Sequence, residues 1–456
     1  MGHKKDEHLV IIGGDAAGMS AAMQARRMRP ELRITAFEEG PTTSYAACGM
    51  PYYVEGLVET ADDLVARRAE VFRNKHDIDA RVRHRVEGID MVKKTVLVRD
   101  LETGRTFDQA YDQLMVATGA IPIRPGLPGI EAEGVHTLSI LPDGERIRRE
   151  VEERSPRSAV VVGGGYIGLE MAEALLARGL DVSVVELLPQ VMSTLDEDMA
   201  GLVAGALEKM GVTLYLGEGV ESFETDGGRV TGVKTSRRLL AADLVILAIG
   251  IRPNVALAEE AGIPLGETGA IRVDDSLRTG APDVWAAGDC VESFHLVSGR
   301  KIFIALGTVA NKQGRIAGIN IGGGQARFPG VVGTAITKVG ETEIARTGLT
   351  IREAGKLEIE TVAAFHKGRT KARYFPDAGP MAVKVVAEQG TGRFLGGQIV
   401  GAPGAGKRID VLATALHAGL TVAEMRYLDL AYAPPVSPVW DPILGAVGKA
   451  ADRVGK

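Results

Sequence analysis

The sequence is short of cysteine, of excess positive charge and of long hydrophobic runs, and each shortage excludes a class of protein. Only 2 of its 456 residues are cysteine, which excludes a disulfide-rich secreted scaffold. The net charge is -6, so no basic surplus indicates nucleic acid as a partner, and an anionic ligand would have to meet local arginines. The longest apolar stretches, 159–162 and 244–249, have the length of β-strands, and neither can span a bilayer.

The N-terminal residues give no sign of a targeting segment. Residues 1–8 are polar, and the apolar run after them is broken at Gly13 and Gly14 before it reaches the length of a signal-peptide core. We therefore expect a cytoplasmic protein that does not bind membranes, with cysteines that are catalytic or inert rather than bridged. A hydrophobic fraction of 45% is ordinary for a globular chain, and 456 residues suffice for two to four domains.

Residues 9–38 have the pattern of a nucleotide-binding unit. An apolar strand leads into a glycine turn over 13–18, a helix follows to about Arg29, and a second strand ends at Glu38. In such a unit the pyrophosphate of a dinucleotide lies at the helix N-terminus, and the acidic residue binds the ribose hydroxyls. Asp15 replaces the middle glycine of the usual fingerprint, so this turn alone is a weak sign of a bound nucleotide.

A complete fingerprint follows near the middle of the chain. The strand 159–162 runs into Gly163-Gly164-Gly165-Tyr166-Ile167-Gly168, a full GxGxxG turn, and the next strand ends at Glu186. A glycine turn without a ligand would explain neither Glu186 nor the repetition of the pattern. Two such units in one chain predict two dinucleotides, and FAD with NAD(P)H is the ordinary pair for hydride transfer.

Further turns indicate the same architecture. Thr118 and Gly119 close one strand, and Gly288 with Asp289 closes another, where a carboxylate suits the hydroxyls of a flavin. We expect no metal site. The residues predicted to bind the two cofactors are Gly13, Asp15, Ala16, Ala17, Gly18, Glu38, Glu39, Thr118, Gly119, Gly163, Gly165, Tyr166, Ile167, Gly168, Glu170, Glu186, Gly250, Gly288 and Asp289.

The C-terminal part has a different pattern. From about residue 330, alternating stretches such as 359–362 and 382–386 predict antiparallel strands, and helical periodicity follows over 407–420. The sequence thus predicts an α/β chain with two Rossmann-like dinucleotide-binding domains and a C-terminal α+β dimerisation domain. The predicted limits are 1–119 and 251–328 for the two parts of the FAD-binding domain, 120–250 for the NAD(P)H-binding domain and 329–456 for the dimerisation domain.

Cys48 lies just after the first nucleotide unit, in the run Ser44-Tyr45-Ala46-Ala47-Cys48-Gly49-Met50-Pro51. A free cysteine is more often a small buried hydrophobic residue, but the two nucleotide units favour a redox role here. Pro51 predicts a helix that begins just after the sulfur, and a helix N-terminus favours the thiolate. Cys290 lies far along the chain and is expected to be structural, so the sequence offers no adjacent redox pair.

Together these motifs resemble the single-cysteine pyridine nucleotide-disulfide oxidoreductases, and most closely their coenzyme A-disulfide reductase branch. The resemblance covers essentially the whole chain. It implies a homodimeric flavoenzyme that uses NAD(P)H to reduce a small-molecule disulfide through Cys48. The residues that carry it are Ser44, Cys48-Gly49, Pro51-Tyr52, Thr118-Gly119, 163–170, Gly288-Asp289, Lys407-Arg408-Ile409-Asp410 and Ala431-Tyr432-Ala433-Pro434-Pro435.

The branches of this family differ in what the cysteine reduces. One branch reduces CoA disulfide through a mixed disulfide of cysteine and CoA, one reduces oxygen or peroxide through a sulfenic acid, and one acts on polysulfide, often with a fused rhodanese domain. Ala16 stands where the oxygen-reducing branch usually has a histidine, which disfavours oxygen as the acceptor. Ala47 stands where the CoA branch usually has Asn. We expect no rhodanese module, because the chain ends soon after Tyr432.

The resemblance also assigns residues to the substrate. Tyr374 and Tyr432 match two tyrosines that approach the cysteine from the partner subunit, where a phenol can donate a proton to a leaving thiolate. Arginine suits the phosphates of CoA because its guanidinium is a planar fork. Solvated helix faces for the basic residues and packing roles for the tyrosines are the alternatives. The implied CoA contacts are Gln24, Arg27, Ser44, Lys407 and Arg408.

The expected reaction transfers a hydride from NADH, bound at 163–168, to the flavin and then an electron pair to Cys48. Tyr166 is expected to gate the nicotinamide pocket, with Glu170 close by. Glu186 predicts NADH as the preferred donor, because its carboxylate binds the ribose hydroxyls and repels the 2′-phosphate of NADPH. Two alternatives stay open: an NADH oxidase or polysulfide reductase that uses the same Cys48, and a flavoprotein that transfers electrons to a partner protein or senses redox state.

Overall fold

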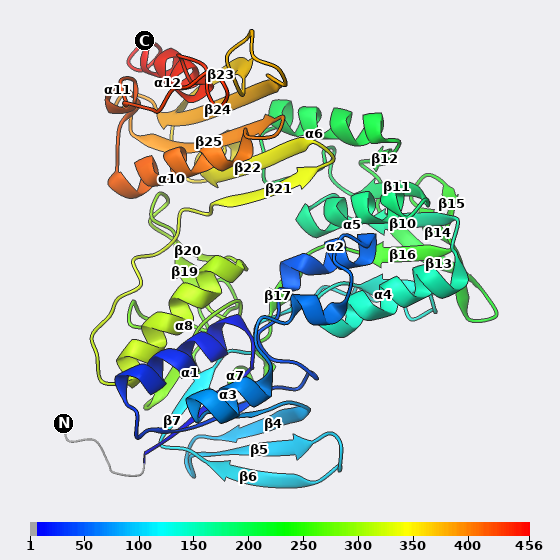
Figure 1. Cartoon of the computed structure of the whole chain (residues 1–456), viewed down its shortest axis with the longest axis vertical. Helices are drawn as coiled ribbons and strands as arrows, with labels where there is room; N and C mark the ends of the chain where they lie inside the picture. The colour runs from blue at the N-terminus through cyan, green and yellow to red at the C-terminus, as the bar shows by residue number, and fades with distance from the viewer. Residues whose placement is uncertain (1–6) are drawn as a thin grey trace.

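The first glycine turn lies at the end of a strand in a five-stranded parallel sheet with the order β18-β7-β1-β2-β3. In the computed structural model this unit forms the lower part of the molecule (Figure 1). The structure describes residues 7–456, so residues 1–6 of the polar start lie outside the described residues. All of β1 is buried, as in a sheet covered on both faces. The strands are β1 (His8–Ile12), β2 (Arg33–Phe37), β3 (Asp79–Arg81), β7 (Gln113–Val116) and β18 (Val284–Ala286).

Two helices from distant parts of the sequence complete this unit. Helix α1 (Ala16–Met28) packs on α8 (Gly307–Ile321) with almost no space between the backbones. A Cβ at Gly314 would lie 2.2 Å from the Ala17 oxygen, and one at Gly318 would lie 2.4 Å from the Ala21 oxygen. Only glycine permits this approach. The two helices are the blue and yellow-green pair in Figure 1.

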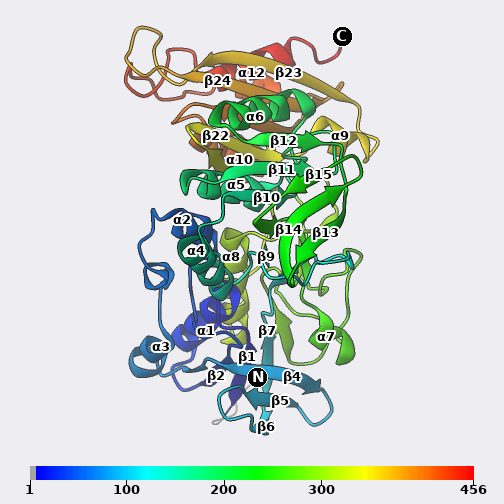
Figure 2. The same cartoon turned by 90° about the vertical axis from the view of Figure 1, so that its right-hand side faces the viewer.

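The second glycine turn belongs to another parallel sheet, with the order β12-β11-β10-β16-β9. One contiguous stretch of chain forms all five of its strands, and a three-stranded antiparallel sheet lies beside it (Figure 2). The elements are β9 (Val135–Thr137), α4 (Leu141–Arg154), β10 (Ser158–Val162), α5 (Tyr166–Ala177), β11 (Asp181–Glu186), α6 (Glu197–Met210), β12 (Thr213–Leu216), β13 (Val220–Asp226), β14 (Arg229–Thr235), β15 (Leu239–Ala241) and β16 (Leu244–Leu247).

The C-terminal unit is a five-stranded antiparallel sheet, β21-β22-β25-β24-β23, with helices packed on it. Its core contains fully buried Val383, Leu395, Leu412 and Ile443. The elements are β21 (Ala335–Val339), β22 (Thr342–Gly348), α9 (Ile351–Gly355), β23 (Thr361–Arg369), β24 (Pro380–Glu388), β25 (Phe394–Gly401), η3 (Gly406–Arg408), α10 (Ile409–Ala418), α11 (Val422–Met425) and α12 (Pro442–Ala451).

Shorter elements connect the units and carry the cysteine segment. They are η1 (Ala47–Gly49), α2 (Met50–Glu55), η2 (Ala61–Leu64), α3 (Ala69–His76), β4 (His84–Asp90), β5 (Thr95–Asp100), β6 (Thr106–Ala110), β8 (Ala120–Pro122), β17 (Ile251–Pro253), α7 (Ala256–Glu260), β19 (Glu292–Phe294) and β20 (Lys301–Phe303).

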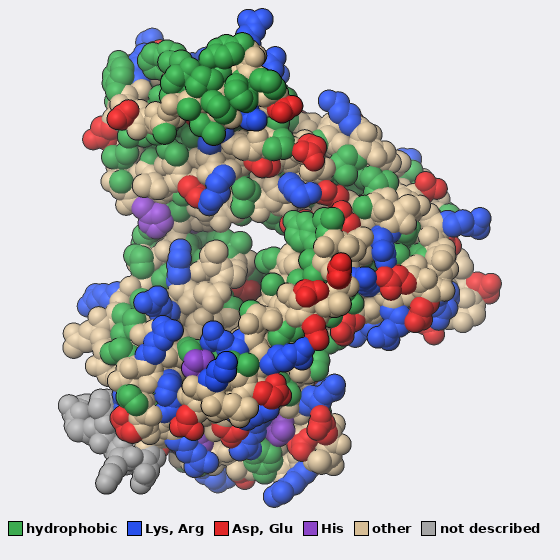
Figure 3. All heavy atoms as spheres, in the orientation of Figure 1, with side chains coloured by type: hydrophobic (Ala, Val, Ile, Leu, Met, Phe, Trp, Pro, Cys, Tyr) green, Lys and Arg blue, Asp and Glu red, His purple; other side chains and the backbone are tan. Residues whose placement is uncertain are grey.

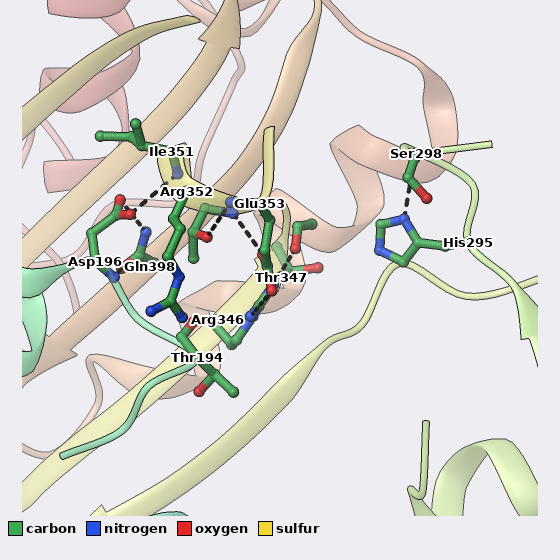
Figure 4. A network of polar contacts seen from close by, with 12 residues as sticks. Thr194, Asp196, His295, Ser298, Arg346, Thr347, Ile351, Arg352, Glu353 and Gln398 are labelled. Atoms are coloured by element: carbon green, nitrogen blue, oxygen red, sulfur yellow. Dashed lines mark hydrogen bonds and ion pairs between the residues drawn. The ribbon is translucent and has the colours of Figure 1, made fainter. Parts of the chain in front are cut away.

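A buried polar network holds the second unit against the C-terminal unit (Figure 4). Arg346 on β22 donates to both carboxylate oxygens of Glu353, at 3.0 and 2.9 Å, and to the Thr194 carbonyl at 2.8 Å. Asp196, just before α6, exchanges hydrogen bonds with Gln398 on β25. Charge-assisted bonds of this kind fix the relative position of the two units.

The fold confirms the prediction of an α/β chain with two Rossmann-like units and a C-terminal α+β unit, whereas the exact limits of the three domains stay a prediction. In residues 7–456, no helix is both long enough and apolar enough to cross a membrane. The same described residues contain no cluster of three or more His, Cys, Asp or Glu side chains suited to hold a metal ion.

Candidate functional site

The first glycine turn passes very close to the end of β7. Gly13 has a φ of 106°, and a Cβ at this position would lie 2.1 Å from the Ala117 oxygen. A Cβ at Gly18 would lie 2.0 Å from the Gly13 oxygen. Both positions therefore require glycine. The N-terminus of α1, with Ala16 and Ala17 in its first turn, meets the end of the sheet where a pyrophosphate would be bound.

Glu38 ends β2 and faces this turn. Its carboxylate accepts hydrogen bonds from the backbone N–H groups of Gly14 and Gly40, both at 2.7 Å. Burial raises the pKa of Glu38, and the two N–H groups oppose that shift. Glu39 points elsewhere, because its carboxylate forms an exposed ion pair with Arg85 at 2.6 Å. Of the two predicted acidic residues, Glu38 is the one that faces the first turn.

Asp15, the departure from the usual fingerprint, connects the turn to the cysteine segment. Its side chain accepts a hydrogen bond from the Tyr45 N–H at 3.2 Å. Ser44 has a φ of 47°, and its N–H donates to the Gly14 oxygen at 3.0 Å. Burial is the main reason that the pKa of Asp15 rises to about 6. No local sequence pattern indicates that Asp15 is bonded to the segment that leads to Cys48.

The polar groups of the first unit fit a bound FAD. Gly288 has a φ of 90°, and a Cβ there would lie 2.9 Å from the Cβ of Ala17, so the turn closes over α1. The neighbouring Asp289 has one carboxylate oxygen that is buried without a hydrogen-bond partner in residues 7–456, and burial raises its pKa to about 6. Such an acceptor needs a donor, and a flavin hydroxyl would supply one. Thr118 donates to the Asn254 carbonyl at 2.6 Å, which fixes the adjoining turn at Gly119.

The second turn repeats the geometry of the first. Gly163 has a φ of 108°, and a Cβ at Gly168 would lie 2.0 Å from its oxygen. Glu186 ends β11 and accepts from the N–H groups of Gly164 at 2.7 Å and Leu188 at 2.8 Å. A Cβ at Gly165 would meet no atom within 4 Å. This open helix N-terminus fits the pyrophosphate of a nicotinamide dinucleotide.

Other predicted residues of the second site surround the start of α5. The Tyr166 hydroxyl is buried and makes no hydrogen bond within the described residues. Glu170 accepts from the Thr337 hydroxyl at 2.6 Å, and burial raises its pKa. Thr337 belongs to β21, so the C-terminal unit contributes a residue to this site. Local sequence patterns could not indicate that contact. Ile167 lies in the first turn of α5, and Gly250 follows β16 with a φ of 116°.

Cys48 lies in η1, directly before α2, and is exposed in the single chain. Pro51 occupies the first turn of α2, as predicted. The expected lowering of the thiol pKa is wrong for this chain. Loss of hydration, followed by the nearby carboxylates of Glu170, Asp289 and Asp15, raises the pKa of Cys48. The protein alone therefore does not favour the Cys48 thiolate. A bound cofactor or substrate would have to stabilise it.

Cys290 is fully buried, and its thiol lies 3.4 Å from the Ala287 carbonyl oxygen. Burial raises the pKa of Cys290 to about 11, so the thiol stays protonated. The two cysteines form no disulfide.

The predicted CoA contacts lie in two separate places. Arg27 on α1 is exposed and forms no ion pair in the described part of the chain, whereas Gln24 is half-buried one turn earlier. Ser44 is hydrogen-bonded to the first turn through Gly14 and lies close to Cys48 in sequence. Lys407 is exposed and paired with Asp410. Of these five residues, only Ser44 belongs to the Cys48 segment itself.

Arg408 is committed to its own unit. Its Nε donates to the buried Asp441 carboxylate at 2.8 Å, and its Nη2 donates to the carbonyls of Thr370 at 2.8 Å and Val436 at 2.9 Å. It therefore connects the two segments that carry the predicted tyrosines. Asp441-Pro442 is recognisable in sequence as a helix start, but its pairing with Arg408 depends on tertiary structure.

Tyr374 and Tyr432 lie beside each other on these segments. The Tyr374 hydroxyl hydrogen-bonds to that of Tyr432 and thereby raises the pKa of Tyr432. Both side chains are exposed, at 76% and 47%. Within residues 7–456 of one chain, no hydrogen bond joins either tyrosine to Cys48. Other large hydrophobic side chains exposed nearby in sequence are Tyr427, Val436, Val439 and Trp440, and Figure 3 shows hydrophobic side chains gathered over this end of the molecule.

Comparison with known proteins gives one consistent family. The pyridine nucleotide-disulphide oxidoreductase family matches residues 7–326, and the dimerisation domain of that family matches residues 334–442. The chain is 40% identical over 445 residues to an NAD(P)H coenzyme A polysulfide/persulfide reductase of Pyrococcus horikoshii, covering 97% of this chain and 98% of that protein. An NADH oxidase of Methanocaldococcus jannaschii is 36% identical over 446 residues, 98% of this chain and 99% of the oxidase.

A solved structure agrees with these matches. Reduced Bacillus anthracis CoADR-RHD superimposes with a TM-score of 0.95 at 36% sequence identity, covering 98% of this chain and 80% of that chain. The chain therefore belongs to the pyridine nucleotide-disulphide oxidoreductases and is an NAD(P)H-dependent flavoprotein oxidoreductase.

Proposed function

We propose that this enzyme reduces coenzyme A disulfide to two CoA thiols with NAD(P)H, through a mixed disulfide between Cys48 and CoA. The observation that carries the proposal is the single accessible thiol. Cys48 is exposed beside the first glycine turn, whereas Cys290 is fully buried and protonated. A centre with one cysteine cannot form an internal disulfide, so any disulfide at Cys48 takes its second sulfur from another molecule.

The first turn, Glu38 and Asp289 would hold FAD, which would supply the electron pair of NAD(P)H that reduces the mixed disulfide. The Cys48 thiolate then attacks one sulfur of the next CoA disulfide, a Cys48–CoA bond forms, and the S–S bond of the substrate breaks to release a CoA thiolate. One NAD(P)H and one proton are consumed for each disulfide, and two CoA thiols leave.

The chain offers a proton donor for the leaving thiolate. Tyr432 has a raised pKa because of its hydrogen bond with Tyr374, so its phenol stays protonated at neutral pH. These tyrosines are exposed on the C-terminal unit and, in one chain, are not bonded to Cys48. We therefore assign them to the active site of a second subunit in a homodimer. The exposed Val436, Val439 and Trp440 would be covered in that dimer.

The phosphates of CoA would meet Arg27, which is exposed and free of ion pairs in the described residues. Gln24 and Ser44 would contribute polar contacts closer to Cys48. Lys407 would have to leave its pair with Asp410 to bind a phosphate. Arg408 would have to break bonds with Asp441, Thr370 and Val436, so its support for the tyrosine segments is the stronger assignment.

Intact mass under non-reducing conditions tests the proposal. We expect the purified holoenzyme, after exposure to CoA disulfide, to carry the added mass of one CoA that dithiothreitol removes. Cys290→Ser should carry the same adduct and Cys48→Ser should carry none. Wild-type protein that stays unmodified and does not consume NADH with CoA disulfide would contradict the proposal.

A second candidate, reduction of polysulfide or persulfide, is favoured by the name of the Pyrococcus horikoshii relative. An oxidase is favoured by the Methanocaldococcus jannaschii relative but disfavoured by Ala16 in the first turn. Rates of NADH consumption with CoA disulfide, with polysulfide and with oxygen alone separate the three. Negligible rates with all of them would favour electron transfer to a partner protein.

Subunit mixing tests the shared site. Cys48→Ser subunits and Tyr374→Phe, Tyr432→Phe subunits should each be inactive as homodimers. After verified exchange, a heterodimer contains one complete site, so part of the activity should return. No recovery after exchange would count against the contribution of the second subunit.

A further inference from the structure

The loop that follows Glu186 contains no cation that could bind the 2′-phosphate of NADPH. Its residues are Leu187, Leu188, Pro189 and Gln190. Two arginines nevertheless come close to this loop from another element. Arg237 and Arg238 lie in the turn between β14 and β15, far from Glu186 in the sequence.

Backbone hydrogen bonds hold that turn against the loop in two steps. The Ser236 N–H donates to the Gly219 oxygen at 2.8 Å, which fixes the turn on the segment that follows β12. The N–H groups of Gly217 and Glu218 in that segment donate to the oxygens of Leu188 at 2.9 Å and Glu186 at 3.1 Å. The turn between β14 and β15 is therefore attached to the end of β11.

The two arginines differ in what they bind. Arg238 is paired with Glu218, which is 2% exposed, through Nε at 3.2 Å and Nη2 at 2.8 Å. Its guanidinium also lies over the Tyr215 ring, 4.6 Å from the centroid. Arg238 is thus committed to the protein.

Arg237 is exposed, and within residues 7–456 its side chain makes no hydrogen bond or ion pair. Its Nη2 lies 3.8 Å from the position of a Cβ at Gly217. Gly217 has a φ of 65° and no side chain. The Arg237 guanidinium therefore lies directly beside the backbone of the segment that is bonded to Leu188. Among the described residues, the guanidinium of Arg237 thus lies unpaired beside Gly217, in the segment that is hydrogen-bonded to the loop after Glu186.

We propose that Arg237 is a specificity-determining residue that binds the 2′-phosphate of NADPH. A guanidinium can donate two parallel hydrogen bonds to a phosphate, and the pair is charge-assisted. Glu186 is held by the N–H groups of Gly164 and Leu188, which oppose part of its negative charge. Glu186 can therefore accept hydrogen bonds from the ribose hydroxyls of NADH, while Arg237 binds the 2′-phosphate of NADPH.

Calorimetric binding of NADP⁺ and NAD⁺ to the oxidised holoenzyme tests this assignment without any turnover. In Arg237→Ala we expect the Kd for NADP⁺ to rise about tenfold while the Kd for NAD⁺ changes less than about twofold, since only NADP⁺ carries the 2′-phosphate. Arg237→Lys should retain part of the NADP⁺ affinity. Lys234→Ala, on β14 just before this turn and paired with Glu221, is the matched control and should leave both constants unchanged.

Three results would overturn the assignment: no binding of NADP⁺ by the wild-type enzyme, equal weakening of both nucleotides in Arg237→Ala, or no weakening at all. Because neither nucleotide reacts with the oxidised enzyme, these results are independent of whether CoA disulfide is the substrate.

Discussion

The two glycine turns of this chain have nearly the same backbone and different surroundings. Gly13 and Gly163 have φ values of 106° and 108°, and each turn is followed by a strand whose terminal glutamate accepts two backbone N–H bonds. The similarity extends to the close contact made by Gly18 and Gly168. A dinucleotide pyrophosphate demands this geometry, whichever dinucleotide is bound.

The turns differ at their third residue. Asp15 in the first turn is half-buried and bonded to the segment that leads to Cys48, whereas Gly165 in the second turn has open space beside it. The first turn is therefore hydrogen-bonded to the neighbouring segment through its third residue, and the second has free space at that position. This difference suits a cofactor that stays bound at the first turn and a donor that is exchanged at the second.

We expect the largest effect from substitution of Cys48, which lies in the segment bonded to the first turn. Cys48→Ser should reduce disulfide turnover at least about a thousandfold, equivalent to ~4 kcal/mol, because serine cannot form the mixed disulfide. Flavin content and anaerobic reduction of the flavin by NADH should be unchanged, since both turns are intact. Steady-state and stopped-flow absorbance measure the two properties. Cys290→Ser is the control and should keep wild-type turnover.

The free space beside Gly165 can be tested by placing an aspartate there, the residue that the first turn has at the equivalent position 15. Gly165→Asp should raise the KM for NADH roughly thirtyfold, about 2 kcal/mol, because a carboxylate would lie near the pyrophosphate. Gly165 has a φ of -86° and is the N-cap of α5, so Asp fits the backbone. Gly165→Asn has the same size without the charge and should raise the KM much less. Equal effects of Asp and Asn would show that bulk matters rather than charge.

The burial of the first turn predicts a pH-dependent stability. Burial raises the pKa of Asp15 to about 6 from its ordinary value of 3.8, so the native state favours the protonated form. This contribution to stability is complete below the unfolded pKa and is lost as the pH rises through about 6. In the flavin-free protein, Asp15→Asn should therefore raise the free energy of unfolding by about 1.5–2 kcal/mol at pH 7 and by almost nothing near pH 4.

Urea denaturation at the two pH values measures this difference. Asparagine retains an oxygen that can accept the Tyr45 N–H, so the comparison isolates the charge. The same gain at pH 4 and pH 7 would exclude ionisation of Asp15 as its cause.

Substitution of Glu186, which ends the strand after the second turn, should change the preference between NADH and NADPH without affecting flavin binding. Glu186→Arg should shift the ratio of kcat/KM towards NADPH by at least about tenfold, roughly 1.4 kcal/mol, because it removes a repulsive charge near the 2′-phosphate and adds a cation. Flavin content should not change, because Glu38 serves the other turn. A wild-type enzyme that strongly prefers NADPH would contradict our interpretation of Glu186.

The parts of the site that were predictable from sequence are those whose signals are local. A glycine turn, its flanking strands and its terminal glutamate lie within about 30 residues, and steric rules connect them directly to the backbone. The predicted strand 159–162 lies in β10, and Pro51 in the first turn of α2.

The parts that were not predictable depend on contacts between distant segments. Loss of hydration, together with carboxylates from three distant segments, raises the pKa of Cys48, so the nearby helix start predicted the wrong direction. The bonds of Arg408 to Asp441 and Thr370 form only in the folded unit, so the sequence could not show that this guanidinium is already paired. Arg237 carries no motif at all, and only the hydrogen bonds through Gly217 and Gly219 bring it near the loop after Glu186.

The close contact of α1 with α8 has a consequence for synthesis on the ribosome. The second sheet is contiguous, from β9 to β16, and can form as soon as Leu247 has left the exit tunnel. The first sheet lacks its edge strand β18 until much later, and the surface of α1 around Ala17 and Ala21 stays uncovered until Gly314 and Gly318 arrive. The unit encoded first is thus completed after the unit encoded second, and its long-range pairing leaves apolar surface exposed to chaperones and proteases in the meantime.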